Sequence, residues 1–118
     1  MTPPERGGVF WVPFIYHGRT SEGPPVVKRR PCVVLSTSWY HAGRGEVVLA
    51  AMTSNTKRAA LPGDTLIRRW QQAGLRSPTV ATMILRTVPA DTLGGQLGKL
   101  ASEDMDVITE NLQAALGT

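Results

Sequence analysis

Short runs of apolar and β-branched residues alternate with polar stretches rich in glycine and proline over the first hundred positions of the chain. Runs of this length, bounded by turn-forming residues, are typical of β-strands. Pro13 lies in the first run and indicates that this strand ends there or occupies the edge of a sheet. We predict strands at residues 8–14, 31–38, 46–54 and 77–89, and a short strand or turn at 94–100.

The stretches between these runs carry turn signals of different lengths. Residues 15–30 hold two glycines and two adjacent prolines, which predicts a long loop. Loops of this length in compact domains are often functional. Residues 39–45 are predicted to form a turn, and residues 55–64 a basic loop. Residues 65–74 are ambiguous, because a strand end is followed by a pattern that fits one or two helical turns stopped by Gly74.

The chain closes with a segment, residues 102–117, whose apolar positions recur at helical spacing. Ser102 is a good N-cap residue, and acidic residues follow it where the helix dipole favours them. One face of the predicted helix carries Met105, Ile108, Leu112, Ala115 and Leu116. Several short strands followed by one amphipathic helix predict a mainly β (α+β) fold, a small barrel or strongly curled sheet with the helix packed on it.

Composition and charge limit the number of domains and the kinds of partner. The 118 residues are enough for one domain, 1–118, and 42% of them are hydrophobic, which excludes global disorder. Thirteen Lys and Arg against nine acids give a net charge of +4, which an ordinary basic protein can also have. Such a charge favours nucleic acid, an acidic protein tail or a membrane surface as partner.

Further compositional features concern compartment and metals. Cys32 is the only cysteine, so the chain forms no internal disulfide or cysteine-based zinc site, and a small buried hydrophobe is the expected role of this residue. The N-terminal residues lack the apolar stretch of a signal peptide, and no apolar run reaches the roughly 20 residues that cross a bilayer. We therefore expect a cytoplasmic protein without a metal site.

The densest positive charge precedes a buried strand, in the stretch KRRPCVVLSTS at residues 28–38. A strand needs no cations to begin, so this position suggests that an anion binds there. Aromatic side chains that could stack on unpaired nucleic-acid bases lie at Trp39, Tyr40 and Trp70.

Several segments, taken in order over nearly the whole chain, resemble the MazF/PemK toxins. They are RGGVFWVPF, SEG followed by KRRPCVVLS, VVLAAMTSN, LRTV and LGKLASEDMDVITENLQAALG. The resemblance implies an SH3-like curled β-barrel of the CcdB/PemK type and a homodimer. It also implies metal-independent, sequence-specific cleavage of single-stranded mRNA through the 2′-hydroxyl, without a cofactor. An acidic antitoxin that blocks the RNA groove is implied as partner.

The family's functional residues can be carried over onto matching positions. Its catalytic arginine, which directly precedes the proline, corresponds to Arg30, and its catalytic threonine at the end of the third strand corresponds to Thr53. Ser54 matches the neighbouring polar position, and Glu22 matches the loop glutamate.

Three departures accompany these matches. Gly8 stands where relatives have an acid, and the loop before the arginine is longer than usual. Met83 stands three residues before an Arg-Thr pair, where relatives often have another acid. If that acid is needed for catalysis, the chain is instead a catalytically degenerate barrel of the same fold that binds RNA or protein. A poison of DNA gyrase is a weaker alternative, since this barrel also occurs in such toxins but the chain ends QAALGT, without their exposed tryptophan.

The expected chemistry suits these residues. When a 2′-hydroxyl attacks the adjacent phosphorus, a base must take its proton, an acid must protonate the leaving oxygen, and donors must stabilise the charge on phosphate. The planar guanidinium of Arg30 can hold two phosphate oxygens at any working pH, and Thr53 can donate a hydrogen bond to the same phosphate. Glu22 is the best candidate for the base, and His17 is the second.

Other basic residues fit a less specific role. Lys28 and Arg29 are expected to attract phosphates without reading sequence, and Lys57 and Arg58 to extend the RNA groove. Lys57 and Arg58 could equally belong to a solvated loop. Arg30 could be a solvated cation and Thr53 an ordinary strand residue, so the prediction depends on whether their side chains share one cleft.

Overall fold

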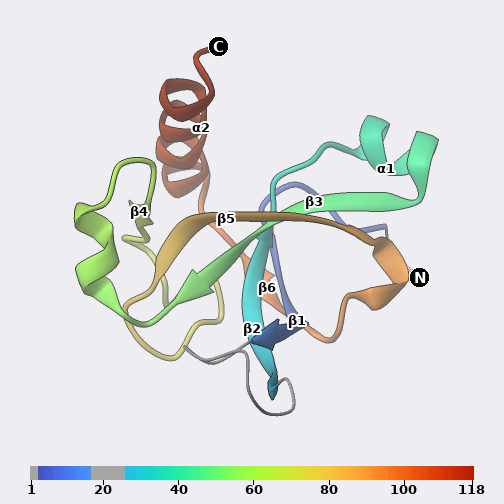
Figure 1. Cartoon of the computed structure of the whole chain (residues 1–118), viewed down its shortest axis with the longest axis horizontal. Helices are drawn as coiled ribbons and strands as arrows, with labels where there is room; N and C mark the ends of the chain where they lie inside the picture. Colours follow the sequence, from blue (N-terminus) through green and yellow to red (C-terminus); the bar gives the residue numbers. More distant parts are fainter. Residues whose placement is uncertain (1–2, 17–25) are drawn as a thin grey trace.

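The computed structural model describes residues 3–16 and 26–118 as one curled, six-stranded antiparallel sheet with two α-helices (Figure 1). The sheet order is β4-β5-β3-β2-β1-β6. Short 3-10 helices, η1 (Thr56–Ala60) and η2 (Ala90–Thr92), follow β3 and β5. The elements are β1 (Gly8–Tyr16), β2 (Val26–Val34), α1 (Ser38–Arg44), β3 (Glu46–Thr53), β4 (Thr65–Leu66), β5 (Val80–Pro89), β6 (Gln96–Lys99) and α2 (Ser102–Leu116). The mainly β fold with a C-terminal helix is therefore confirmed.

The first two strands are longer than predicted. β1 continues past residue 14, and β2 begins at Val26 rather than at residue 31, so much of the predicted loop at residues 15–30 is strand. The two strands pair continuously from Val9↔Val33 to Tyr16↔Val26. This pairing outweighs the weak strand propensity of the basic residues and prolines. The cations at residues 28–30 consequently lie within a strand, on a rigid element.

Both prolines in this pair of strands are tolerated because they fall where one edge is open. β2 pairs with β3 only from Cys32 to Val34, so Pro31 stands where β2 leaves its neighbour. The Trp11 amide donates to the Gly95 carbonyl at 3.1 Å, away from β2. Pro13, two residues further along, faces the same edge beyond the last paired residue of β6. The prediction from Pro13 is wrong in form, because β1 continues to Tyr16 and lies between β2 and β6. Pro13 is tolerated in this interior strand because it stands beyond the part of β1 that β6 covers.

Two predictions about helices are wrong in detail. Residues 39–45 were predicted as a turn but belong largely to α1, which Thr37 caps at its start and Gly45 at its end with a φ of +68°. Ser102 is the first residue of α2 rather than its N-cap, which is Ala101. The predicted apolar face is buried only in its first half, since Met105 and Ile108 are buried but Leu116 is 64% exposed.

The ambiguous segment at residues 65–74 forms the two-residue strand β4 and then turns, without a helix. Its position is set by Asp104 at the start of α2, which is 2% exposed. The Asp104 carboxylate accepts the backbone N–H groups of Arg68 at 2.9 Å and Arg69 at 3.0 Å. A charge-assisted side-chain contact thus stabilises the backbone where no helix does.

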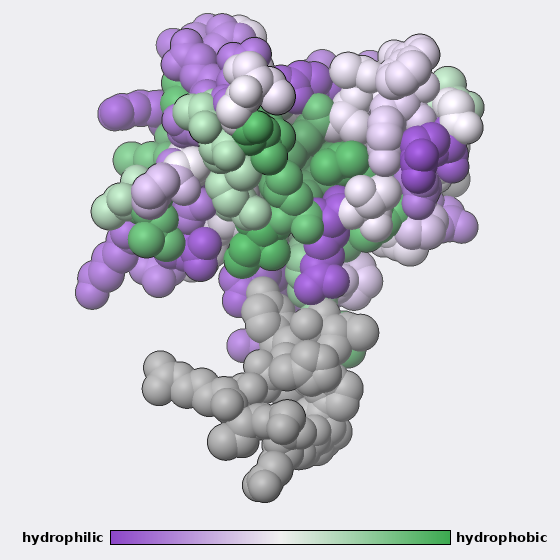
Figure 2. Space-filling model, turned by 45° about the horizontal axis from the view of Figure 1, so that its top comes forward, coloured by the Kyte–Doolittle hydropathy of each residue, from purple (hydrophilic) through white to green (hydrophobic). Residues whose placement is uncertain are grey.

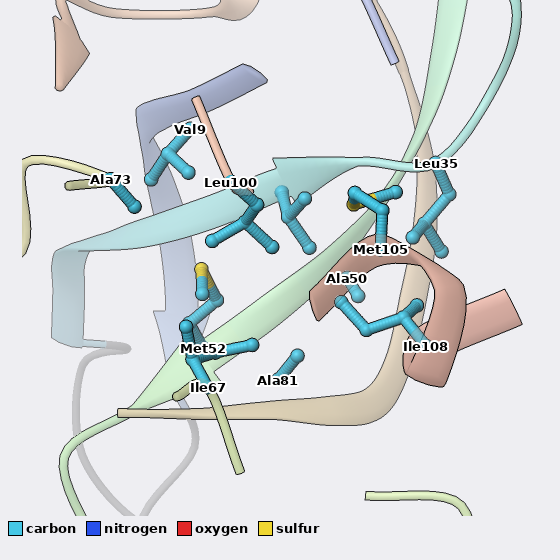
Figure 3. Close-up of a cluster of buried hydrophobic side chains, with 11 residues drawn as sticks. Val9, Leu35, Ala50, Met52, Ile67, Ala73, Ala81, Leu100, Met105 and Ile108 are labelled. Atoms are coloured by element: carbon cyan, nitrogen blue, oxygen red, sulfur yellow. The ribbon is translucent and has the colours of Figure 1, made fainter. Parts of the chain in front are cut away.

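The core lies on both faces of the sheet. The cluster between the sheet and α2 (Figure 3) consists of Val9, Val33, Leu35, Ala50, Met52, Ile67, Ala73, Ala81, Leu100, Met105 and Ile108. The other cluster, on the opposite face, consists of Val12, Phe14, Cys32, Val34, Val47, Leu49 and Ala51. Because successive strand residues point to opposite faces, odd-numbered residues of β3 serve the second cluster and even-numbered residues at its end serve the first.

An apolar groove remains on the surface between α1 and α2. Figure 2 shows apolar side chains gathered on this face, and Leu35, Val48, Leu85, Leu112 and Leu116 are among the residues that line the groove. In the described part of the chain, no helix has the length and hydropathy needed to cross a bilayer.

Candidate functional site

The candidate site lies where β2 and β3 separate. Cys32 and Ala51 are the last residues that pair the two strands on this side, and both belong to the second core cluster. One step outward on the same face, two residues along each strand, stand Arg30 and Thr53. Side-chain alternation and strand register therefore direct both functional candidates toward the same opening.

The larger cavity at this opening has a volume of about 280 Å³. Its basic lining residues are Lys28, Arg29, Arg30 and Arg76, and no acid lies among the described residues that line it. The remaining lining residues are Trp11, Pro31, Met52, Thr53, Ser54, Gly74, Leu75, Ser77, Thr79 and Leu97. The cavity combines positive charge with apolar wall, as a site for a phosphate and an unpaired base requires.

A second cavity of about 200 Å³ adjoins the first. Arg30, Met52 and Thr53 line both cavities. The second cavity is completed by Ala51, Arg58, Thr82 and Ile84. We call the two cavities together the cleft. Because Arg30 and Thr53 both line the two cavities, they face a common space.

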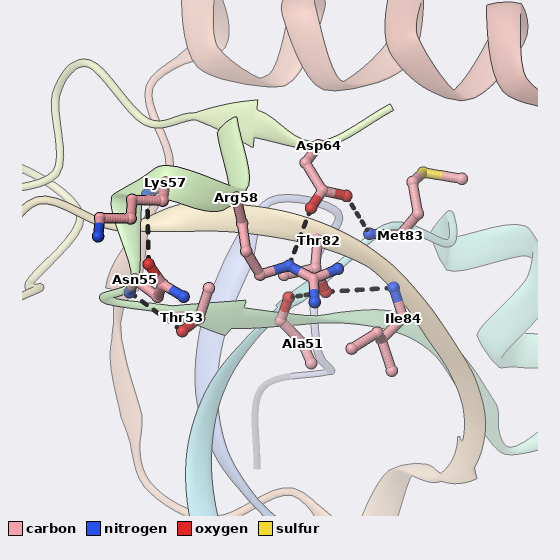
Figure 4. Close-up of polar contacts among 9 residues, drawn as sticks. All are labelled: Ala51, Thr53, Asn55, Lys57, Arg58, Asp64, Thr82, Met83 and Ile84. Carbon is pink, nitrogen blue, oxygen red and sulfur yellow. Dashed lines mark hydrogen bonds and ion pairs between the residues drawn. The ribbon is translucent and has the colours of Figure 1, made fainter. Parts of the chain in front are cut away.

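The hydroxyl of Thr53 is oriented by the turn that follows β3. Its oxygen accepts the backbone N–H of Asn55 at 3.1 Å (Figure 4). Asn55 in turn accepts the backbone N–H of Lys57 at 3.3 Å and so caps η1. Since a hydroxyl has one donor and two acceptor sites, the proton of Thr53 is available for donation into the cleft.

Most of the other predicted residues within the described part of the chain also line the cleft. Arg29 lies on the face opposite Arg30, with its guanidinium 5.5 Å from the ring centre of Trp11. Ser54 and Lys28 line the larger cavity, and Arg58 lines the smaller one. Lys57 lines neither of them. Glu22 and His17, the candidates for the base, lie outside the described residues.

Two of the three departures from the family pattern, Gly8 and Met83, do not fall on the cleft lining. Gly8 pairs with Lys99 at the start of β1, where an added Cβ would lie 2.8 Å from the ring of Phe10. Met83 lies between two residues that line the smaller cavity but is not itself a lining residue, and its side chain packs against Gly63. Neither position is occupied by a group that could contact the substrate phosphate.

Sequence reasoning missed several residues of the site. Trp11 lines the larger cavity, and its ring centre lies 5.5 Å from the guanidinium carbon of Arg29. Arg76, between the predicted segments 65–74 and 77–89, also lines this cavity, and a cation between Gly74 and Pro78 is a signal that could have indicated it. Buried Asp64, which contacts Arg58, carried no signal beyond its place in a loop.

The aromatic residues proposed for base stacking lie elsewhere. Trp39 is 82% exposed on α1 and lines the apolar groove with Tyr40. Trp70 packs against the first core cluster. None of the three lines the cleft.

Cys32 is 1% exposed, next to the cleft, and burial raises the pKa of its thiol to about 12 although nearby Arg30 acts in the opposite direction. At pH 8 we therefore expect the native protein to react with a thiol reagent on the order of 10³-fold more slowly than the unfolded chain, whose cysteine has a pKa near 8.5. An absorbance assay with an aromatic disulfide, with and without urea, measures the ratio. Equal rates would contradict the burial of this thiol.

The raised pKa of the Cys32 thiol also makes the stability of the fold depend on pH. The unfolded chain loses its thiol proton above about pH 8.5, while the folded chain keeps it up to about pH 12. Between these values the folded state binds more protons, so this group's contribution to the free energy of unfolding falls as the pH rises.

A comparison with protein families matches residues 5–116 to the family described as PemK-like, MazF-like toxin of type II toxin-antitoxin system. Similar curated proteins include endoribonuclease MazF2 of Mycobacterium bovis and endoribonuclease MazF6 of Mycobacterium tuberculosis. Each is 29% identical to the chain over 112 residues, covering 94% of the chain and 95% of the relative.

Solved structures show the same fold. The MazE-MazF structure from Deinococcus radiodurans has a TM-score of 0.74 at 21% identity and covers 100% of this chain and 99% of that one. An endoribonuclease in complex with its cognate antitoxin, from a mycobacterial species, has a TM-score of 0.70 at 22% identity, over 99% and 96% of the two chains. With a curled β-sheet, a basic cleft and a family match over residues 5–116, the chain belongs to the PemK-like, MazF-like toxins of type II toxin-antitoxin systems.

Proposed function

We propose that the chain is an endoribonuclease toxin that cleaves single-stranded mRNA at short specific sequences, with Arg30 and Thr53 on the scissile phosphate. The observation that carries this proposal is the cleft lined by both side chains at the point where β2 and β3 separate. The relatives named endoribonuclease MazF support the reaction class.

The reaction begins when the 2′-hydroxyl oxygen attacks the adjacent phosphorus. The 2′-oxygen–phosphorus bond forms and the phosphorus–5′-oxygen bond breaks, which leaves a 2′,3′-cyclic phosphate and a free 5′-hydroxyl. A base accepts the 2′-hydroxyl proton, and an acid returns a proton to the leaving 5′-oxygen. Glu22 remains our first candidate for the base and His17 the second.

Arg30 acts as the transition-state clamp. Charge on the nonbridging phosphate oxygens increases as the fifth bond to phosphorus forms, and a guanidinium fixed on a strand can bind two of these oxygens. Thr53 donates to the same phosphate from the neighbouring strand. Because these groups are a cation and a hydroxyl rather than carboxylates, they bind phosphate directly, and we propose that catalysis is independent of a metal ion.

The RNA follows the positive charge on either side of this phosphate. Lys28, Arg29 and Ser54 bind backbone groups along the larger cavity, and Lys57 and Arg58 attract the strand beyond η1. The 5.5 Å contact of Arg29 with Trp11 presents a flat surface on which an unpaired base can stack.

Two protein partners complete the proposal. An acidic antitoxin segment, disordered when free, occupies the basic cleft and excludes RNA, in keeping with the solved structures whose titles include MazE or a cognate antitoxin. A second copy of the chain covers the apolar groove between α1 and α2, which exposes Trp39 and Leu116 to solvent in a single chain. The cytoplasm, where mRNA is translated, is the proposed location.

Incubation of the purified protein with labelled single-stranded RNA in excess EDTA tests the reaction. We expect cuts at fixed short sequences and products that carry a 2′,3′-cyclic phosphate. Tight binding without cleavage would instead favour the degenerate binding barrel. Cleavage that requires an added divalent cation would contradict the proposed mechanism.

A further inference from the structure

A buried carboxylate lies beside the smaller cavity of the cleft. The side chain of Asp64 is 2% exposed and makes two contacts, shown in Figure 4. Its Oδ1 atom accepts the backbone N–H of Met83 at 2.9 Å, and its Oδ2 atom accepts Nε of Arg58 at 3.1 Å. One acid therefore joins β5 to η1 at the edge of the cleft.

The contact with Met83 arises from an irregularity in the sheet. The pairing of β3 with β5 shifts register between Ala50 and Met52, so residues of β5 opposite this point lose their ladder partners. Thr82 replaces one missing bond by donating its hydroxyl to the Ala51 carbonyl at 2.7 Å, and it accepts the N–H of Ile84 at 3.1 Å. Asp64 accepts the N–H of the residue between them.

The backbone before Asp64 is also fixed. Gly63 has a φ of +90°, and a Cβ added there would lie 2.6 Å from Cγ of Met83. Only glycine fits this conformation and this contact without strain or displacement of the Met83 side chain. The Oδ1 atom of Asp64 is thus bonded to β5, and the next residue, Thr65, pairs with Ala81 of the same strand, so Oδ2 is offered at a defined place.

Arg58 is the residue that this anchor orients. Its side chain is 35% exposed and, with Nε bound to Asp64, lines the smaller cavity together with Arg30 and Thr53. A long side chain on a short exposed helix would otherwise sample many rotamers. A buried carboxylate also needs a cationic partner, because an unpaired charge in this position would be strongly unfavourable.

We propose that Asp64 is a positioning residue that fixes Arg58 as a second guanidinium on the reacting phosphate. Arg58 approaches this phosphate from η1, whereas Arg30 approaches from β2. This inference rests on the proposed function and deepens it, since it turns Arg58 from a general attractor of RNA into a group that contacts the scissile phosphate.

The test compares single-turnover cleavage by Asp64→Asn, Arg58→Ala and the double variant. Asparagine keeps the size of Asp64 and an oxygen for the N–H of Met83 but removes the charge. We expect each single change to slow cleavage roughly 10–100-fold with a smaller change in KM. We expect the double variant to be no slower than Arg58→Ala, because Asp64 acts through that residue. Multiplied losses in the double variant, or no loss from Asp64→Asn, would overturn the proposal.

Matched controls separate positioning from folding. Asp104 is an equally buried carboxylate that accepts backbone N–H groups, and Arg69 is an exposed arginine paired with Glu103 at 3.2 Å. Asp104→Asn is expected to lower the melting temperature without slowing cleavage by the folded fraction, and Arg69→Ala to change neither. A similar rate loss in Asp104→Asn would show that the effect of Asp64 is structural.

Two further measurements apply if Asp64→Asn does not fold or if the unsubstituted chain cleaves no RNA. If Asp64→Asn does not fold, Arg58→Lys decides, since lysine keeps the charge but lacks the Nε–H group that donates to Asp64. A rate equal to that of the unsubstituted chain would then overturn the proposal.

If the unsubstituted chain cleaves no RNA, the proposed function fails. Binding of an RNA with 2′-deoxy nucleotides still reports on Arg58, whose loss should reduce the salt dependence by about one phosphate contact. An unchanged salt dependence would overturn the inference independently.

Discussion

Replacement of Arg30 by alanine is expected to lower the rate of RNA cleavage by roughly 10³-fold or more. Removal of one preorganised donor to a developing oxyanion costs about 10²–10³-fold, and loss of a transition-state arginine about 10³–10⁵-fold. Among the described residues, Arg30 is the only cation that lines both cavities of the cleft. It stands on β2 where that strand pairs with β1, so its backbone is held in place before substrate binds.

The Arg30→Lys variant makes this prediction more specific. Lysine keeps the positive charge but presents a single ammonium group, so it should retain RNA binding and recover only part of the rate. Arg44→Ala is a suitable control, because Arg44 lies on α1 and pairs with Glu46 at 2.9 Å. Single-turnover cleavage of a labelled RNA measures all three. An Arg30→Ala protein that cleaves within tenfold of the unsubstituted chain would remove Arg30 from the mechanism.

Replacement of Gly74 by alanine is expected to destabilise the fold by about 3–5 kcal/mol. Gly74 has a φ of +80°, and a Cβ built there would lie 2.1 Å from the carbonyl oxygen of Leu97. The contact is reciprocal, since a Cβ on Gly98 would lie 2.4 Å from the carbonyl oxygen of Ala73. Two backbones touch here, and neither can move as a flexible side chain would. Urea denaturation measures the loss.

Gly45 provides the matched control for this prediction. Its φ of +68° imposes the same left-handed strain, but no atom lies within 4 Å of an added Cβ. Gly45→Ala should therefore cost only about 1 kcal/mol. Equal losses at the two glycines would show that the backbone contact is unimportant. Because residues 74–77 form one wall of the larger cavity, Gly74→Ala should also weaken RNA binding by the protein that remains folded.

Apolar spacing was sufficient to predict most strands and the C-terminal helix, because burial on the sheet and the face of α2 leaves a periodic pattern. It was insufficient where strand pairing or helix-capping groups, rather than burial, determine the local structure. The basic residues before Pro31 lack strand propensity, yet pairing with β1 places them in β2. In α1, which has no buried residue, the capping groups of Thr37 and Gly45 rather than an apolar face define the helix.

The residues of the candidate site likewise divide into those that the sequence pattern indicates and those whose role depends on tertiary contacts. The sequence pattern indicates Arg30 and Thr53 as candidates, since Arg30 stands two residues before buried Cys32, Thr53 stands two residues after buried Ala51, and each belongs to a motif. The pattern did not indicate Asp64, because the role of this residue depends on the N–H group of Met83, which becomes available only through a register shift between β3 and β5. The pattern did not indicate Trp11 either, because aromatic residues in a first strand usually pack in the core. The early end of β6 beside β1 leaves it at the cleft instead.

The most direct test of the account is a crystal structure with a short single-stranded RNA whose nucleotide at the cut site lacks the 2′-hydroxyl. Without this nucleophile the substrate binds but is not cleaved, so the position of its phosphate can be observed. We predict one phosphate within hydrogen-bond distance of both the Arg30 guanidinium and Oγ1 of Thr53. An RNA bound elsewhere on the protein, with no phosphate between these two side chains, would contradict the account.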